Sequence, residues 1–203
     1  MSSVPGTRGY EASVRDFVEV SQALKFHEVC RDFLEYLPEP PARILDVGAG
    51  AGQNAAALAR SGYQVTAIEP MAAFRSASQA AYPGLDVTWQ EDSLPLLESL
   101  NEQAPFDFIL LDGVWHHLQA AERTEALSRL AGLLCSGGKC ALSLRNGPAG
   151  MGTHVFPTSA NETVRQAQAT GLTCIFLREN LPSVLPNKEA VRWARIVLLR
   201  PTG

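Results

Sequence analysis

Residues 44–52 read Ile-Leu-Asp-Val-Gly-Ala-Gly-Ala-Gly, an apolar run that ends in a glycine-rich turn. Short apolar runs of this kind are typical of buried strands, and the apolar pattern over residues 53–61 predicts that a helix follows at once. Glycine allows a positive φ and lets the backbone approach a ligand closely, while the first turn of a helix presents unpaired amide groups. We therefore predict a ligand-binding site where this strand meets this helix.

The spacing of the glycines separates two classes of ligand. A dinucleotide site of the GxGxxG type needs a third glycine at position 53, but Gln53 stands there and the third glycine is Gly52. The chain also lacks an obvious Tyr-x-x-x-Lys pair. A nicotinamide-dependent oxidoreductase that uses NAD or NADP is therefore the less favoured alternative.

From Arg43 onward, short apolar runs alternate with amphipathic stretches, which is typical of parallel strands joined by crossover helices. The runs Leu172–Leu177 and Val191–Leu199 lie too close together for a crossover helix, so we expect them to pair antiparallel through a loop. Gly137-Gly138 is interpreted as a helix C-cap. Further strands are predicted over residues 43–47, 64–68, 87–90, 106–111 and 138–144, and helices over 53–61, 71–81, about 94–101, 118–134 and about 159–169.

The N-terminal part of the chain has a different pattern. Residues 1–12 look like a mobile arm, and the apolar repeat that follows predicts one helix over about 13–37. Proline lacks the amide donor of a helix, so the Pro-Glu-Pro-Pro segment that comes next marks a border. We expect an N-terminal arm and helical cap over residues 1–40 and a Rossmann-like domain over residues 41–203.

Composition excludes several classes of protein. The 203 residues suffice for one well-buried domain, and with a formal net charge of −4 and scattered Lys and Arg we expect no nucleic-acid partner. Neither a secretory signal nor a membrane-spanning run is recognised, so a cytoplasmic protein without membrane contact is expected. The cysteines lie far apart without metal-binding spacing, so no metal site is predicted.

The DxGxGxG pattern that begins at Asp46 resembles motif I of the class I S-adenosylmethionine-dependent methyltransferases. That resemblance implies an α/β fold with a doubly wound, mostly parallel seven-stranded sheet, an antiparallel last strand and helices on both faces, here with an N-terminal helical cap. It also implies S-adenosyl-L-methionine as cofactor and S-adenosyl-L-homocysteine as product. Later segments resemble further motifs of the family in the same order: Val65–Pro70, Trp89–Ser93, Phe106–Leu118 and Leu133–Leu142.

The resemblance also implies roles for individual residues. Asp46 would help position the ammonium group of the cofactor, Glu69 would accept its ribose hydroxyls, and Met71 would pack on its adenine. Glu69 as a solvated strand-end acid is the alternative. Asp92 and the Ser93 amide would bind the adenine edge, or simply cap the helix predicted after them. The cofactor-binding residues are thus expected to be Asp46, Gly48, Gly50, Gly52, Glu69, Met71, Asp92, Ser93 and Asp112.

Residues beyond the fourth and fifth strands are candidates for the acceptor side. His116 or His117 could act as a general base, or both could be part of the core. The segment after the fourth strand lacks an Asn/Asp-Pro-Pro-Tyr/Phe motif, so a small-molecule methyl acceptor is expected, with oxygen, nitrogen or carbon as the methylated atom. A binding or scaffold protein of the same fold without turnover is the other alternative. Candidate substrate contacts are Tyr10, Arg145, Asn146 and His154.

Overall fold

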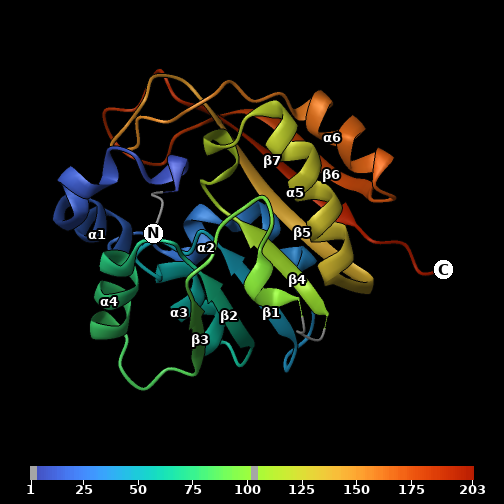
Figure 1. The fold of residues 1–203 in the computed structure, drawn as a ribbon, viewed down its shortest axis with the longest axis horizontal. Coiled ribbons are helices and arrows are strands. Elements are labelled where there is room, and N and C mark those ends of the chain that lie inside the picture. The colour runs from blue at the N-terminus through green and yellow to red at the C-terminus, as the bar shows by residue number, and fades with distance from the viewer. Residues whose placement is uncertain (1–3, 102–104) are drawn as a thin grey trace.

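One seven-stranded sheet organises the chain (Figure 1). The computed structural model describes residues 4–101 and 105–203. The strand order is β3-β2-β1-β4-β5-β7-β6. The strands are β1 (Arg43–Val47), β2 (Gln64–Ile68), β3 (Val87–Gln90), β4 (Phe106–Leu111), β5 (Leu134–Asn146), β6 (Thr173–Pro182) and β7 (Arg192–Leu199).

The direction of the strands follows the predicted pattern. Strands β1 to β5 pair in parallel, whereas β7 lies antiparallel between β5 and β6. This confirms the mostly parallel sheet with an antiparallel last strand. The order reverses at β1, because β2 and β3 extend the sheet on one side and β4 and β5 on the other. Ligands of open α/β sheets bind at the carboxyl ends of the strands beside such a reversal.

Helices cover both faces of the sheet, as predicted (Figure 1). Side chains alternate along each strand, so Leu45 and Ile44 belong to opposite cores. The first core includes residues of α5 (Ala120–Leu133) and α6 (Ala160–Ala169), and the second includes residues of α3 (Gln53–Arg60). In the described ranges, no helix combines the length and the apolar character needed to cross a membrane.

The single helix predicted over residues 13–37 is wrong. The backbone is extended at Lys25, with φ −96° and ψ 127°. The break lets α1 contact α4 (Ala72–Ala81), while Cys30 and Phe33 bury against the sheet, which one straight helix could not do. Residues 1–3 of the predicted arm lie outside the described residues. The segment forms η1 (Pro5–Thr7), η2 (Tyr10–Ser13), α1 (Val14–Gln22), α2 (Phe26–Val29) and η3 (Arg31–Tyr36).

The helix predicted over about 94–101 is also wrong, since only the short η4 (Glu98–Leu100) forms there. The carboxylate of Asp92 accepts the backbone N–H groups of Ser93 and Ser99, both at 2.7 Å. These bonds close a loop in place of capping a helix. The alternative in which Asp92 and Ser93 cap a helix is therefore corrected as well.

The glycine pair Gly137-Gly138 does not cap α5. The helix ends at Leu133 and β5 begins with the next residue, so both glycines lie inside a strand longer than the predicted 138–144. A Cβ on Gly138 would lie 3.0 Å from the carbonyl oxygen of Cys135 and 3.1 Å from that of Phe106. Close backbone packing at an irregular part of the β4–β5 pairing thus requires a glycine at 138, whereas Gly137 adopts a φ of 78°, which favours glycine.

We expect Phe33→Ala to lower the free energy of unfolding by about 3–5 kcal/mol. The ring is 1% exposed and belongs to the core that joins the N-terminal segment to the sheet. Urea denaturation followed by circular dichroism measures the change. Leu34→Ala, in the same η3 segment but 38% exposed, is the matched control and should stay within about 0.5 kcal/mol of the parent. Equally small losses for both variants would contradict this packing.

Candidate functional site

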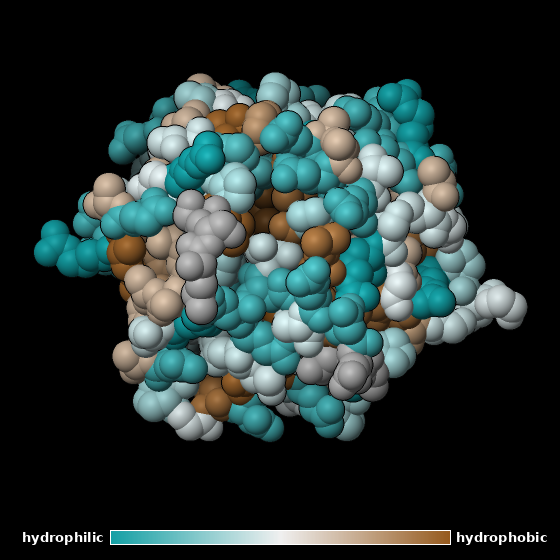
Figure 2. All heavy atoms as spheres, viewed as in Figure 1, coloured by the Kyte–Doolittle hydropathy of each residue, from teal (hydrophilic) through white to brown (hydrophobic). Residues whose placement is uncertain are grey.

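A cavity of about 500 Å³ opens at the carboxyl ends of the parallel strands. Its walls come from the glycine-rich turn after β1, the loops after β2, β4 and β5, the segment before β7 and the N-terminal segment. Figure 2 shows a hollow on the viewed face whose floor is hydrophobic. The cavity therefore lies at the reversal in strand order. Among the predicted site residues, the lining includes Gly48, Gly50, Glu69, Met71, Asp92, Ser93, Asp112, His116, His117, Tyr10 and Arg145.

The glycine-rich turn needs its glycines for two different reasons. Gly48, Gly50 and Gly52 have φ values of 71°, 54° and 81°, which L side chains rarely adopt. A Cβ on Gly48 would also lie 2.4 Å from Val114, whereas Gly50 faces the cavity beside Phe17. Gly52 lies behind the turn, against α4, and borders a separate, smaller cavity.

Glu69 joins the two loops that flank the reversal. Its carboxylate accepts the backbone N–H of Gly50 at 2.9 Å and that of Met71 at 2.8 Å. The residue is 5% exposed, and this burial raises the pKa of Glu69 to about 7 in spite of the two backbone N–H groups, which lower it. Each carboxylate oxygen still has a lone pair for a further donor.

Asp46 is an acid with unused hydrogen-bonding capacity. It is 1% exposed and lies behind the lining of the cavity, and its Oδ2 atom has no hydrogen-bond partner among the described residues. Burial, with the nearby carboxylates of Asp112 and Glu69, raises the pKa of Asp46 to about 8. Buried polar groups are normally paired, so the unpaired Oδ2 leaves Asp46 able to take a further hydrogen bond.

Asp112 is held by side chains from several elements. It accepts hydrogen bonds from Ser143 at 2.7 Å, Asn54 at 3.4 Å and Arg195 at 3.4 Å. Arg195 also donates to the carbonyl of Val29 at 3.3 Å, which connects β7 to the N-terminal segment. Sequence reasoning missed Arg195, although a charge inside the apolar run of β7 was a signal for it.

The geometry around His117 determines its tautomer. Its Nδ1 lies 2.8 Å from the carbonyl oxygen of His154, and a carbonyl can only accept, so Nδ1 carries the proton. Nε2, 3.1 Å from the hydroxyl of Tyr10, is then the acceptor. Burial lowers the pKa of His117. Burial also lowers the pKa of the adjacent His116 to about 2, so that ring is neutral.

Aromatic side chains of the N-terminal segment form part of the cavity wall. The Phe17 ring stacks on Phe74 with centroids 4.6 Å apart, and Tyr10 meets Phe17 edge-on at 5.1 Å. The carbonyl of Arg8 accepts the backbone N–H of Thr153 at 2.8 Å, which ties this segment to the loop after β5. Sequence reasoning missed Phe17 and Phe74, since no motif marks them.

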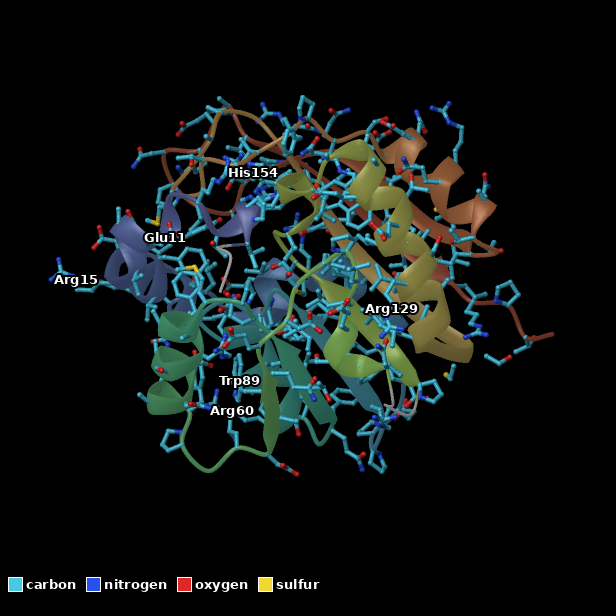
Figure 3. The ribbon with its side chains drawn as sticks, viewed as in Figure 1. Glu11, Arg15, Arg60, Trp89, Arg129 and His154 are labelled. Atoms are coloured by element: carbon cyan, nitrogen blue, oxygen red, sulfur yellow. The ribbon has the colours of Figure 1, made fainter. Side chains whose placement is uncertain are left out.

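The remaining predicted substrate residues differ in their surroundings. Arg145 lines the cavity and donates to the carbonyl of Pro148 at 2.6 Å. The side chain of Asn146 is engaged with the backbone of Thr158 through both its oxygen and its nitrogen. His154, on the loop after β5 (Figure 3), offers its carbonyl to His117. The structure thus brings Arg145, but neither the Asn146 nor the His154 side chain, to the cavity lining.

Metal binding is a separate question. No cluster of at least three His, Cys, Asp or Glu side chains fit to hold a metal ion occurs within the described ranges.

Several known proteins resemble this chain in sequence or in fold. An uncharacterised methyltransferase of Mycobacterium tuberculosis is 36% identical over 110 residues, covering 51% of this chain and 54% of that protein, so the chain spans about half the length of this relative. The structure of a SAM-dependent methyltransferase of Methanosarcina mazei has a TM-score of 0.69 at 16% identity. The match covers 89% of this chain and 100% of that protein. A third similar protein is the 1,6-didemethyltoxoflavin-N1-methyltransferase of Burkholderia thailandensis, which was solved with 1,6-didemethyltoxoflavin and S-adenosylhomocysteine bound. Its structure has a TM-score of 0.64 at 18% identity, and the match covers 99% of this chain and 92% of that protein.

The family comparison covers most of the chain. The sequence pattern of the family described as methyltransferase domain matches residues 22–181. That match includes β1 to β5, the glycine-rich turn and almost all of β6. The chain therefore belongs to the methyltransferase-domain family.

Proposed function

We propose that this chain is an S-adenosylmethionine-dependent methyltransferase that acts on a small-molecule acceptor. The observation that carries the proposal is the buried Asp46, whose unpaired Oδ2 lies behind a glycine-rich turn that Glu69 holds in place. The cofactor is a sulfonium with an ammonium group, and both positive charges offset the cluster of Asp46, Glu69 and Asp112. The Burkholderia enzyme, bound to S-adenosylhomocysteine and a small acceptor, supports the same assignment by its overall similarity.

The residues of the cavity suit each part of the cofactor. The ammonium group would donate toward Asp46, and the ribose hydroxyls would donate to the free lone pairs of Glu69. Met71 would pack on the adenine, where a thioether contact is favourable. Asp92 and the backbone of Ser93 would bind the adenine edge, since both line the cavity. Asp112 would face the methionine part from the β4 side.

The chain itself has mainly to position the acceptor and exclude water. The cofactor, when bound, supplies an activated methyl group, and displacement proceeds when the acceptor atom is held in line at about 3–3.5 Å. His117 has a neutral ring whose unprotonated Nε2 can accept a proton, so we assign it as the base for a hydroxyl or ammonium acceptor. In this arrangement the Tyr10 hydroxyl occupies the place that the acceptor's own X–H group would take.

We expect micromolar binding of S-adenosylmethionine and S-adenosylhomocysteine by calorimetry, and none of NAD or NADP. Glu69→Gln should weaken that binding by about tenfold to a hundredfold. The amide nitrogen of glutamine is a donor, so it cannot accept from the backbone N–H groups of Gly50 and Met71 and from the ribose hydroxyls as both carboxylate oxygens can. Gly50→Val should abolish it, since φ is 54° and the site lies against Phe17. Glu125→Gln, at an exposed residue of α5 outside the cavity lining, is the control. Unchanged binding in both folded site variants would refute this placement, and binding without turnover of any acceptor would favour a scaffold.

Binding of the cofactor at pH 7 should release protons. Asp46 and Glu69 have pKa values of about 8 and about 7 in the ligand-free protein, so both carboxyls are partly protonated there. A bound cation favours the ionised forms, lowers both pKa values and expels the protons. Affinity should therefore rise from pH 6 to pH 8. Calorimetry in phosphate and in Tris reports the release as a difference in enthalpy, which Asp46→Asn should reduce. Equal enthalpies in both buffers would count against the proposed site.

Side-chain ¹⁵N NMR should show His117 as the Nδ1–H tautomer at neutral pH. Because burial lowers the pKa of His117 below its ordinary 6.5, the ring should protonate only when the pH falls below that value. Tyr10→Phe removes the hydroxyl and should leave the tautomer unchanged, since the His154 carbonyl determines it. An Nε2–H tautomer would contradict the assignment of His117 as the base, and protonation above pH 6.5 would contradict the effect of burial on its pKa.

A further inference from the structure

The charges that line the cavity are separated along its length. The acids Glu69 and Asp92 follow β2 and β3. The cations Arg145, Lys188 and Arg195 belong to β5, the loop between β6 and β7, and β7, respectively. Two acids on the β4 side are already engaged. Asp112 pairs with Arg195, and Glu122 accepts the backbone N–H of Gln119 at the start of α5. A cationic ligand therefore fits the β1–β3 half, and the β5–β7 half favours an anion.

Arg145 is the cation best placed to bind that anion. In the β5–β7 pairing it lies opposite Trp193, and Ser143 lies opposite Arg195 on the same face of the sheet. Arg195 is 7% exposed and its charge is paired with Asp112. Arg145 is half-buried, and within the described ranges no carboxylate lies within 4.0 Å of it. Among the residues that the structure describes, only the carbonyl of Pro148 accepts from Arg145, whereas a guanidinium has five donors.

Arg145 also lies close to the residues assigned to proton transfer. Arg145, Tyr10 and His117 all line the same cavity. Burial raises the pKa of Tyr10, and the positive charge of Arg145 opposes that rise; burial lowers the pKa of His117, and the charge of Arg145 lowers it further. Burial without an acidic partner lowers the pKa of Arg145 itself. A charged group that loses water and gains no partner is costly, and an anionic ligand would remove that cost.

Much of the remaining wall of this half of the cavity is apolar. The indole of Trp193 and side chains of the N-terminal segment and of the loops after β5 and β6 form its walls, where residues of low polarity suit an apolar ligand body. The charge at Arg145 is thus surrounded by surface that water solvates poorly. These walls include Val20, Leu24, Met151, Leu185 and Trp193.

We propose that the methyl acceptor is an organic anion, with a carboxylate or phosphate bound by Arg145, an apolar body against Trp193 and its reacting hydroxyl or amine at His117. This inference rests on the proposed function. The carboxylate of the cofactor is a competing occupant of Arg145. The acceptor is favoured because Arg145 belongs to β5, beside Tyr10 and His117, and not to the glycine-rich turn.

Calorimetry on protein saturated with S-adenosylhomocysteine tests the proposal. The probes are 4-hydroxybenzoate and 3-(4-hydroxyphenyl)propanoate, the methyl ester of each, and 4-hydroxyphenyl phosphate. At least one anion should bind tenfold or more tightly than its neutral counterpart, and the phosphate probe distinguishes a phosphate from a carboxylate preference. Arg145→Gln should weaken anion binding by about tenfold to a hundredfold, and Arg145→Lys should retain part of it. Arg15→Gln changes the net charge equally at a residue that is 93% exposed and points away from the molecule (Figure 3), and it should bind as the parent does.

Affinity for S-adenosylhomocysteine separates the possible failures. It should stay within about twofold of the parent in folded Arg145→Gln. A tenfold loss there would show that Arg145 binds the cofactor's carboxylate and would overturn the proposal. Esters that bind as well as the anions, or a panel in which no anion binds, would overturn it too while the cofactor still binds. If the parent protein binds no S-adenosylhomocysteine at all, the proposed function itself fails.

Discussion

The two hydrogen bonds that Glu69 accepts from Gly50 and Met71 hold together the loops on which the site depends. They join the turn after β1 to the loop after β2, beside the point where the strand order reverses. With the turn held in this way, its positive φ angles are maintained and Asp46 stays buried behind it. Without that connection the cavity would lose the wall that separates its acidic half from solvent.

Local sequence patterns predicted β1 to β4 at the observed bounds, because buried parallel strands form compact apolar runs between turns. They failed for the N-terminal segment, where two parts of one apolar repeat bury against different surfaces. The same limit applies to the candidate site. Glycines and acids at strand ends follow from local motifs, whereas the Arg195–Asp112 pair and the Tyr10–His117 contact join residues distant in the chain, so only the tertiary structure reveals them.

The two halves of the cavity are built in different ways. The half near β1 and β2 consists of short turns held by backbone hydrogen bonds, which leaves little freedom. The half near β5 and β7 is covered by the N-terminal segment, whose Arg8 carbonyl bonds to Thr153 on the loop after β5. Tyr10 also contacts His117 beneath it. Under the proposed function, an acceptor that reaches His117 must therefore displace the Tyr10 hydroxyl from Nε2.

The unpaired oxygen of Asp46 has a consequence for the abundance of the protein. A carboxyl oxygen that is buried without a partner costs the folded state free energy. A ligand that binds only the folded state stabilises it, by about 2.7 kcal/mol at a hundredfold excess over its Kd. Under the proposed function, the fraction of folded molecules follows the supply of methyl donor. When S-adenosylmethionine is scarce, a larger fraction of the molecules would be unfolded and open to proteolysis. The steady-state amount of the protein would then fall together with the concentration of its cofactor.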